Sequence, residues 1–245
     1  MPSASVIDEE VSRFDALAAS WWDPKGPMAP LHAINPVRMR FVRDAIVKHF
    51  GRDDEAVAPF SGLSALDVGC GAGLLTEPLS RLGAEALGLD PGIETIGAAR
   101  SHADSSGAHS RYRVGTLEDV VSEGGRFDIV LAMEVVEHVA DVEFFVTAAA
   151  KALKPGGLFL GSTLNRTLKS FALAIVGAEY VLRWLPTGTH RWDKFVTPAE
   201  FSTALRNAGL WAPNATGLTY APLTRQWRLA RDLDVNYFIA ASKPT

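Results

Sequence analysis

The sequence predicts an α/β fold in which helices cover both faces of a mostly parallel, seven-stranded sheet, the doubly wound arrangement. From Leu63 to Ser162, short apolar runs alternate with helical stretches, a pattern that implies parallel strands joined by right-handed crossovers. After residue 196, one helical stretch is followed by two apolar runs suited to antiparallel pairing. A chain of 245 residues with 47% hydrophobic residues can bury one large core, so we expect a single domain over 1–245.

Residues 1–60 are expected to form a helical lid, and residues 61–162 the alternating core. Apolar residues recur at helical spacing over 6–22 and 35–50, with Pro24, Pro27 and Pro30 between the two helices. In the core, the expected strands cover 63–68, 85–90, 110–114, 127–132 and 157–162, and the expected helices cover 74–82, 92–103 and 141–153.

Residues 163–196 read as an inserted amphipathic segment. The apolar run FALAIVGA, within Ser170 to Pro186, is far shorter than the roughly 20 residues that span a bilayer. Basic residues flank it at positions 166, 169, 183, 191 and 194. The pattern therefore predicts that residues 165–190 lie on an anionic membrane surface, with a buried lid helix as the alternative.

Residues 197–245 are expected to hold the last helix and two antiparallel strands. Thr197 suits the N-cap and Pro198 the first turn of a helix that reaches residue 210. The two late strands are expected over 210–218 and 234–242.

The charge and the single cysteine restrict partner and compartment. A net charge of −4 and a pI near 5.9 give no basic surface for nucleic acid. Cys70 alone excludes an internal disulfide, and the start MPSASVIDEE lacks the charged and apolar regions of a signal peptide. We expect a cytoplasmic protein that associates peripherally with the inner face of the membrane.

Two motifs at the ends of expected strands predict a nucleoside site. LDVGCGAG places Gly69, Gly71 and Gly73 after the first strand, where glycine allows a sharp turn and close approach of a ligand. Leu74 stands where a dinucleotide motif requires its third glycine, which disfavours a nicotinamide-dependent oxidoreductase. Asp90 ends the second strand, where a carboxylate can accept both ribose hydroxyls; an N-cap for the following helix is the alternative.

These motifs resemble the class I S-adenosylmethionine-dependent methyltransferases, over about residues 61–162, through DVGCGAG, LGLD, FDIVLAM and LKPGG. Further segments resemble the ubiquinone biosynthesis O-methyltransferases specifically: FDALAASWWDPKGPMAPLHAINPVR, MEVVEHV, STLNRTLKSF, VGAEYVLR, GTHRWDKF and DVNYF. The resemblance implies a Rossmann-like methyltransferase domain that methylates hydroxyls of polyprenylated catechol or quinol intermediates, at both O-methylation steps of ubiquinone synthesis. It also implies that other ubiquinone biosynthesis proteins are candidate partners of this chain.

The resemblance carries cofactor contacts onto particular residues. Arg38, Gly69, Asp90 and Met133 match the family's contacts to S-adenosylmethionine, and Arg38 suits the methionine carboxylate because a guanidinium binds it bidentately. Asp67, Gly71 and Gly73 belong to the same glycine motif. After the third strand the chain reads GTLED instead of Gly-Asp-Ala, and Leu117 and Glu118 are expected to flank the adenine.

The motif MEVVEHV places Glu134, Glu137 and His138 directly after the fourth core strand. If helix begins there, the i, i+3 and i+4 offsets bring all three side chains to one face. The family resemblance implies that they bind a divalent metal, Mg, Mn or Zn. One alternative makes His138 a metal-free general base oriented by Glu134, and the other makes the acids caps of helix 141–153.

The predicted activity is therefore S-adenosylmethionine-dependent O-methylation, with His138 and Glu134 as catalytic residues. A nucleic-acid amino-group methyltransferase is disfavoured, because MEVVEH replaces the Asn/Asp-Pro-Pro-aromatic motif. Two alternatives stay open: a noncatalytic cofactor-binding scaffold, and an O-methyltransferase for another small phenolic acceptor.

Overall fold

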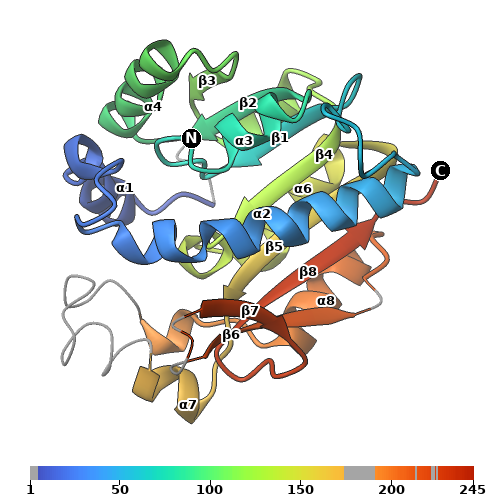
Figure 1. The fold of residues 1–245 in the computed structure, drawn as a ribbon. Coiled ribbons are helices and arrows are strands. Elements are labelled where there is room, and N and C mark those ends of the chain that lie inside the picture. The colour runs from blue at the N-terminus through green and yellow to red at the C-terminus, as the bar shows by residue number, and fades with distance from the viewer. Residues whose placement is uncertain (1–4, 174–190, 213, 222–223, 225) are drawn as a thin grey trace.

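The computed structural model describes residues 5–173, 191–212, 214–221, 224 and 226–245, and its described strands form one sheet. The sheet has eight strands in the order β3-β2-β1-β4-β5-β8-β6-β7. Strands β1 to β5 run parallel, whereas β8, β6 and β7 are joined by antiparallel pairs (Figure 1). The doubly wound, mostly parallel α/β fold is thus confirmed.

The strands match the expected runs with one addition. Their bounds are β1 (Ser64–Val68), β2 (Glu85–Asp90), β3 (Arg111–Val114), β4 (Phe127–Met133), β5 (Leu153–Leu164), β6 (Ala215–Ala221), β7 (Gln226–Ala230) and β8 (Asn236–Ser242). The prediction of seven strands was wrong because it missed one strand, β7. This strand pairs with β6 at the sheet edge and contains no fully buried residue. The strand expected over 210–218 begins instead at Ala215, after an isolated bridge at Trp211.

The helices also follow the predicted order. They are α1 (Asp8–Asp15), α2 (Ala29–Phe50), α3 (Thr76–Arg81), α4 (Ile93–Ser106), α5 (Leu117–Ser122), α6 (Val142–Ala152), α7 (Leu168–Ser170) and α8 (Pro198–Asn207), with short 3₁₀-helices η1 (Ala18–Ser20), η2 (Val136–His138) and η4 (Trp192–Lys194). The N-cap role predicted for Thr197 is confirmed by a capping box with Glu200.

Two differences in the helices have local causes. Helix α2 begins at Ala29 instead of residue 35, because Pro30 occupies its first turn, where a missing N–H costs no hydrogen bond, and Pro36 is accommodated inside the helix. Helix α5 was not expected from the sequence, yet Thr116 and Asp119 form a reciprocal capping box that starts it.

The core lies on both faces of the sheet, as the period-2 alternation of strand side chains requires. Leu66, Val130 and Phe159 pack toward α5, α6 and α8, whereas the adjacent Ala65, Ile129 and Leu158 pack toward α2 and α3. Helix α2 crosses in front of the sheet, with α6 and α8 behind it (Figure 1). Since β1 and β4 are neighbours whose crossovers go opposite ways, their carboxyl ends form a topological switch point, where ligands of such sheets bind.

The predicted membrane-surface helix cannot be compared with the structure over most of its length. Residues 174–190 lie outside the described residues. In the parts of the chain that are described, no helix combines the length and hydrophobicity needed to cross a membrane.

Replacing Phe201 by alanine tests the core behind the sheet. Phe201 is fully buried on α8, edge-on to Phe159 with ring centroids 6.0 Å apart. We expect Phe201→Ala to lower the free energy of unfolding by about 3–5 kcal/mol, from lost burial and the cavity left behind. Chemical denaturation measures this change. Val57→Ala, at a side chain 93% exposed, should stay within about 0.5 kcal/mol of the parent, and equal losses in both variants would contradict the assigned core.

Candidate active site

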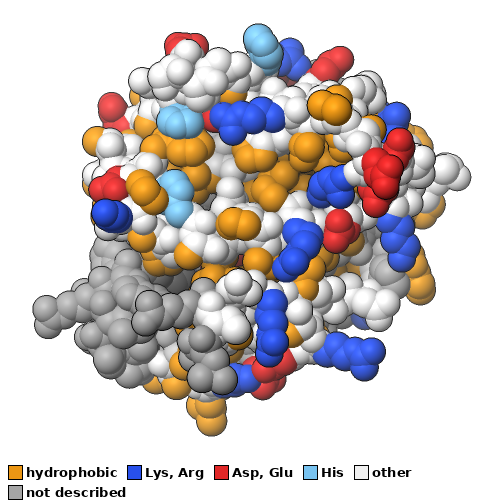
Figure 2. Space-filling view, viewed as in Figure 1, with side chains coloured by type: hydrophobic (Ala, Val, Ile, Leu, Met, Phe, Trp, Pro, Cys, Tyr) orange, Lys and Arg blue, Asp and Glu red, His pale blue; other side chains and the backbone are white. Residues whose placement is uncertain are grey.

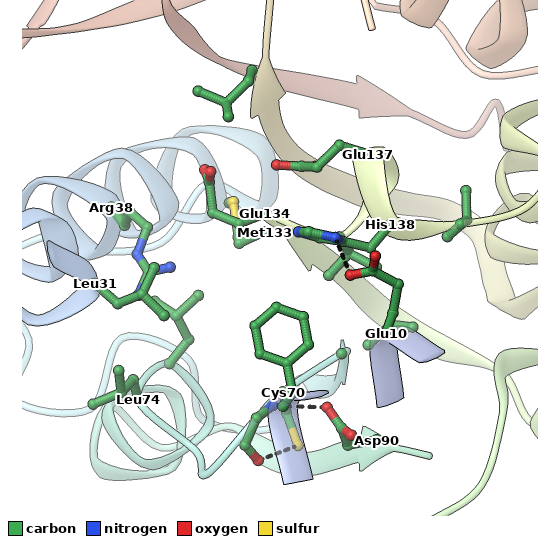
Figure 3. Close-up of a pocket in the computed structure, with 18 of the residues that line it drawn as sticks. Glu10, Leu31, Arg38, Cys70, Leu74, Asp90, Met133, Glu134, Glu137 and His138 are labelled. Atoms are coloured by element: carbon green, nitrogen blue, oxygen red, sulfur yellow. Dashed lines mark hydrogen bonds and ion pairs between the residues drawn. The ribbon is translucent and has the colours of Figure 1, made fainter. Parts of the chain in front are cut away.

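A cavity of about 760 Å³ opens at the carboxyl ends of β1, β2 and β4. Helix α2 supplies Arg38 and Leu31 on one side, and α1 reaches the cavity with Glu10 on another (Figure 3). The sequence-predicted residues that line it are Arg38, Asp67, Gly69, Gly71, Asp90, Leu117, Met133, Glu134, Glu137 and His138. Gly73 and Glu118 are absent from the lining.

The glycine loop turns sharply beneath the cavity. The backbone N–H groups of Gly69 and Cys70 both donate to Leu89 O, at 2.8 and 3.1 Å, and Gly69 has a φ of +64°. At Gly71, with φ +54°, a Cβ atom would lie 2.2 Å from the indole of Trp21. Gly73 instead packs against Tyr112, where a Cβ would lie 2.2 Å from the phenol oxygen. Gly73 therefore shapes the loop without lining the cavity.

Two carboxylates hold the loop from below. Asp67, buried on β1, accepts a hydrogen bond from Thr76 Oγ1 at 2.6 Å, and burial raises its pKa to about 6. Asp90 accepts from the backbone N–H groups of Gly71 (3.1 Å) and Gly92 (2.9 Å), and burial raises its pKa to about 6 as well. Each Asp90 oxygen keeps acceptor capacity for a further donor such as a ribose hydroxyl.

Asp90 does not cap the next helix, so that alternative was wrong. The N-cap position of α4 belongs to Gly92. The N–H and hydroxyl of Thr95 on α4 donate to Asp15 Oδ1, at 2.9 and 2.7 Å. Asp15 is the last residue of α1, so its hydrogen bonds with Thr95 connect the N-terminal segment to the core. The Asp90 carboxylate lines the cavity instead.

Arg38 is a buried cation at the wall of the cavity. Its side chain is 3% exposed, and Nη2 donates to Asn35 Oδ1 at 2.9 Å. Nε has no hydrogen-bond partner among the described residues. Burial lowers the pKa of the guanidinium from its ordinary value, opposed by the charges of Glu134 and Asp67. A buried N–H without an acceptor is costly, so this site favours an anionic ligand.

The motif MEVVEHV does not begin a helix, which corrects the expectation that its three polar side chains share a helical face. Strand β4 ends at Met133, Glu134 takes a left-handed φ of +60°, and only Val136–His138 form a 3₁₀-turn. The Glu134 N–H donates to the carbonyl oxygen and to the hydroxyl of Ser162, both at 3.1 Å. This bend directs the Glu134 side chain into the cavity (Figure 3).

Hydroxyl and amide donors from β5 and β8 hold both carboxylates. Glu134 Oε1 accepts from Ser162 Oγ at 2.6 Å, and Asn236 Nδ2 lies 3.1 Å from each Glu134 oxygen. Glu137 Oε2 accepts from Thr163 Oγ1 at 2.8 Å, while its Oε1 is buried without a hydrogen-bond partner in the described part of the chain. Burial, and then the charge of Glu134, raise the pKa of Glu137 to about 7.

His138 contacts a residue from the other end of the chain. Its Nδ1 lies 2.9 Å from Glu10 Oε2 on α1. Burial lowers the pKa of His138, but the hydrogen bond to Glu10 and the charges of Glu137 and Glu10 outweigh it, so the pKa is raised. The alternative in which Glu134 orients His138 is corrected here, because Glu134 is instead held by Ser162 and Asn236.

The structure gives no support to the predicted metal site. Within the described residues, no group of three His, Cys, Asp or Glu side chains is placed to hold a metal ion. Glu134 is hydrogen-bonded to Ser162 and Asn236. Glu137 is hydrogen-bonded to Thr163, and His138 to Glu10. As placed, the three side chains do not fit a divalent cation. Nor do they cap α6, whose N-cap is Asp141.

Of the two residues predicted to flank the adenine, Leu117 lines the cavity and Glu118 does not. Leu117 is buried and lines the cavity as the first residue of α5. Both carboxylate oxygens of Glu118 are buried without a hydrogen-bond partner in the described ranges, away from the lining. The adenine role of Glu118 stays a prediction.

Sequence reasoning missed Glu10 and Asn236 as site residues. No spacing rule relates Glu10 to His138, which stand 128 positions apart. Asn236 lies within DVNYF, which the family resemblance had already marked. Resemblance was thus the one available signal for Asn236.

The N-terminal segment is fastened to the glycine loop by Trp22. Its indole N–H donates to Ala72 O at 3.0 Å, and its ring stacks on His102 with centroids 3.4 Å apart. His102 Nδ1 in turn lies 2.6 Å from the fully buried carboxylate of Glu77. Together with the contact between Trp21 and Gly71, these contacts place residues 21–22 beside the glycine loop.

Gly71→Ala tests the contact between the glycine loop and Trp21. The added Cβ would meet the indole at 2.2 Å with φ at +54°, and a left-handed non-glycine residue costs about 1–3 kcal/mol. We expect S-adenosylmethionine affinity, measured by calorimetry, to fall by roughly tenfold or more. Gly97→Ala, at an open helical position, should leave it unchanged; an equally unchanged affinity in Gly71→Ala would contradict the close contact.

Residues 66–161 match the family model described as a methyltransferase domain. The structure is similar to magnesium protoporphyrin IX methyltransferase from Synechocystis with bound SAH, with a TM-score of 0.66 and 19% identity over 95% of this chain and 94% of that one. This likeness supports the class I methyltransferase fold.

Sequence relatives are far closer. The chain is 57% identical to the ubiquinone biosynthesis O-methyltransferase of Azorhizobium caulinodans, covering 97% of this chain and 94% of the relative. It is 55% identical to the protein of the same name from Methylobacterium nodulans, covering 98% and 96%. The chain therefore belongs to the family of ubiquinone biosynthesis O-methyltransferases, which are S-adenosylmethionine-dependent enzymes.

Proposed function

We propose that this enzyme transfers the methyl group of S-adenosylmethionine to hydroxyls of polyprenylated catechol or quinol intermediates, at both O-methylation steps of ubiquinone synthesis. The observation that carries the proposal is one continuous cavity. It joins the glycine loop and Asp90 at one end to Glu134, Glu137 and His138 at the other. A cofactor and an acceptor can therefore meet within a single, largely apolar space.

The cofactor residues have complementary chemistry. Arg38 offers a buried guanidinium with an unsatisfied N–H to the methionine carboxylate. Asp90 accepts the ribose hydroxyls, and the backbone at Gly69 and Gly71 allows close approach. Met133 and Leu117 provide apolar contact, both buried beside the cavity.

His138 is the general base in this proposal. A phenolic hydroxyl with a pKa of about 10 and an imidazole near 6.5 differ by about 3.5 units, or about 4.8 kcal/mol of unfavourable transfer. The raised pKa of His138 reduces that difference. Glu134, anchored by Ser162 and Asn236, accepts a hydrogen bond from a hydroxyl of the acceptor and fixes its orientation.

The transfer itself requires alignment above all. The acceptor oxygen attacks the methyl carbon, the carbon–sulfur bond breaks, and the hydroxyl proton passes to His138. Because the sulfonium is already an activated electrophile, holding the two reactants in line contributes most of the acceleration. The carboxylates of Asp67, Asp90 and Glu134 around the cavity favour a cationic cofactor.

The family resemblance also implies a divalent cation, Mg, Mn or Zn. A cation on Glu134, Glu137 and His138 would compete with the hydrogen bonds that Ser162 and Thr163 donate to the two carboxylates. When bound, it would stabilise a phenolate as a Lewis acid. We propose no step that depends on it.

The apolar walls support a prenylated acceptor. Leu31 and Ile34 of α2 and Leu218 and Trp227 of the β6–β7 pair line the same cavity. In Figure 2 hydrophobic side chains gather around a hollow on the face that α2 crosses, with Lys and Arg dispersed among Asp and Glu. Each methylene buried contributes about 0.8 kcal/mol, so a long tail stays largely in a membrane and the enzyme must approach it.

We propose that residues 165–190 make this approach to an anionic membrane at its cytoplasmic face. The described start of the segment exposes apolar side chains: Leu168 (82%), Phe171 (43%) and Leu173 (54%). Its flanking cations are partly neutralised, because Arg166 pairs with Glu200, Lys169 with Asp232, and Arg191 with Asp193. Apolar insertion, more than charge, therefore supports the contact.

Transfer of labelled methyl from S-adenosylmethionine to a short-tailed demethylubiquinol, and to its catechol precursor, tests the function. Product from both acceptors supports both steps. Cofactor binding without turnover on either would favour the noncatalytic scaffold, and turnover of simple phenols alone would favour another acceptor. The assay uses metal-stripped protein with and without Mg, Mn or Zn; activity only with metal would overturn the metal-independent mechanism.

His138→Gln should lower kcat by about 10²–10⁴-fold, the range that general-base removal costs. Binding of S-adenosylmethionine should not change, because the methionine, ribose and adenine contacts are elsewhere. Rapid-quench kinetics and calorimetry measure the two quantities. His109→Gln, at an exposed histidine, is the matched control, and parent-like kcat in His138→Gln would refute the assigned base.

Leu168→Asp should weaken vesicle binding roughly tenfold or more, since burial of a leucine side chain contributes about 1.5–3 kcal/mol. Flotation with anionic phospholipid vesicles measures the bound fraction. Val57→Asp, at an exposed position in the connector between α2 and β1, should float like the parent. If the parent protein does not float, the membrane proposal fails.

A further inference from the structure

Strands β6 and β7 turn one face toward the proposed acceptor site, and the pairing of the strands identifies the residues that share this face. Leu218 on β6 lies opposite Asn236 on β8, whose amide nitrogen is 3.1 Å from the Glu134 carboxylate. Residues directly opposite each other in an antiparallel pair, and residues two apart in one strand, point to the same side of a sheet. Tyr220 and its partner on β7, Trp227, therefore lie on the same side as Asn236.

The side chains on this side of β6 and β7 are apolar or aromatic and belong to the cavity. Leu218 is 3% exposed, Trp227 is half-buried, and Tyr220 is 41% exposed. All three line the cavity, and the two aromatic rings lie together with centroids 5.2 Å apart. On the opposite side of β7, Gln226 and Arg228 are exposed. The aromatic pair thus provides a partly open surface on which an apolar part of a ligand can pack.

The proposed ligands leave one group for this surface. Arg38, Asp90 and the glycine loop suit the polar parts of S-adenosylmethionine, and Glu134 suits a hydroxyl of the acceptor. The prenyl tail of the acceptor is the remaining group, and it is apolar throughout. Leu31 and Ile34 of α2 line the same cavity and pack in the same core cluster as Trp227, so the tail would lie between α2 and the β6–β7 pair.

The spacing of the strands determines which part of the tail reaches the aromatic pair. From Asn236 to Trp227 the path crosses two strand spacings and one step of two residues. With strands about 5 Å apart and a step of about 7 Å along the strand, the separation is about 12 Å. Each prenyl unit adds four carbons to the main chain of the tail, and thus about 5 Å when extended. The second and third units of a tail whose ring lies at Glu134 therefore reach Trp227.

We infer that Tyr220 and Trp227 are specificity-determining residues, which contact the second and third prenyl units and select a prenylated acceptor over a bare ring. The inference deepens the proposed function and rests on its assignment of a polyprenylated acceptor. A cavity of about 760 Å³ has the size of an ordinary small-molecule site, so the rest of a long tail stays outside it. The enzyme accordingly distinguishes short tails from one another and treats all longer tails alike.

The test measures kcat/KM for demethylubiquinols that carry either no tail or a tail of one to four prenyl units. In the parent, we expect kcat/KM to rise up to the third unit and then to level off. In Trp227→Ala, the ratio of kcat/KM for the three-unit acceptor to that for the bare ring should fall roughly tenfold or more, because the tail loses buried contact area. Trp227→Phe, which keeps an aromatic surface, should restore most of this ratio.

Further variants separate the contact from a general loss of structure. Tyr220→Ala should lower the same ratio, whereas Tyr220→Phe should keep it, because the contact uses the ring and not the hydroxyl. Trp211→Ala is the matched control, since this indole is 64% exposed and is not part of the cavity lining; its ratio should equal that of the parent. A partly misfolded variant would lose activity on every acceptor equally, which leaves the ratio unchanged.

The outcomes distinguish this inference from the proposed function. If the parent methylates none of the acceptors, the proposed function fails and the inference fails with it. Turnover that does not depend on tail length, or a Trp227→Ala variant that keeps the parent ratio, overturns the inference alone. If Trp227→Ala keeps the ratio but floats less with phospholipid vesicles, the aromatic pair contacts a membrane lipid instead of the acceptor tail.

Discussion

The site depends on keeping several ionisable groups charged or hydrogen-bonded inside an apolar cavity. A buried carboxylate without partners is expensive, and a pair of carboxylates is more so. Glu134 and Glu137 are tolerated because Ser162, Thr163 and Asn236 donate to them. Arg38 supplies a buried cation on one side of the cavity, and Glu10 is hydrogen-bonded to His138 on the other. Strands β5 and β8 and helices α1 and α2 supply these compensating groups.

This requirement explains why the site is assembled from the whole chain. The turn after β4 contributes the carboxylates, β5 the hydroxyls, β8 the amide, and α1 and α2 the acid and the guanidinium. Glu134 has a left-handed backbone conformation. Ser162 holds its backbone N–H, and Ser162 and Asn236 hold its carboxylate. Such backbone strain persists where surrounding contacts determine it.

Sequence patterns predicted what depends on neighbouring residues. The alternation of strands and helices, the glycine turn at Gly69 and the Thr197 cap are local and were predictable. The course of MEVVEHV was not, because Ser162 bends the chain at Glu134 from 28 positions away. The Glu10–His138 contact spans 128 positions, beyond any periodicity. Strand β7 was missed since its side chains are exposed or only half-buried, which weakens the alternation that marks a strand.

The antiparallel β8 imposes an order on how the enzyme is made. Strands β6 and β7 precede it in the chain, yet they join the sheet only through it, since β8 lies between β5 and β6. Until Asn236 is synthesised, the Glu134 carboxylate lacks its amide partner. A ribosome-bound chain that already contains the complete glycine loop still has an unfinished catalytic end. The catalytic end of the site is therefore complete only after β8, the last described strand in the chain, has emerged.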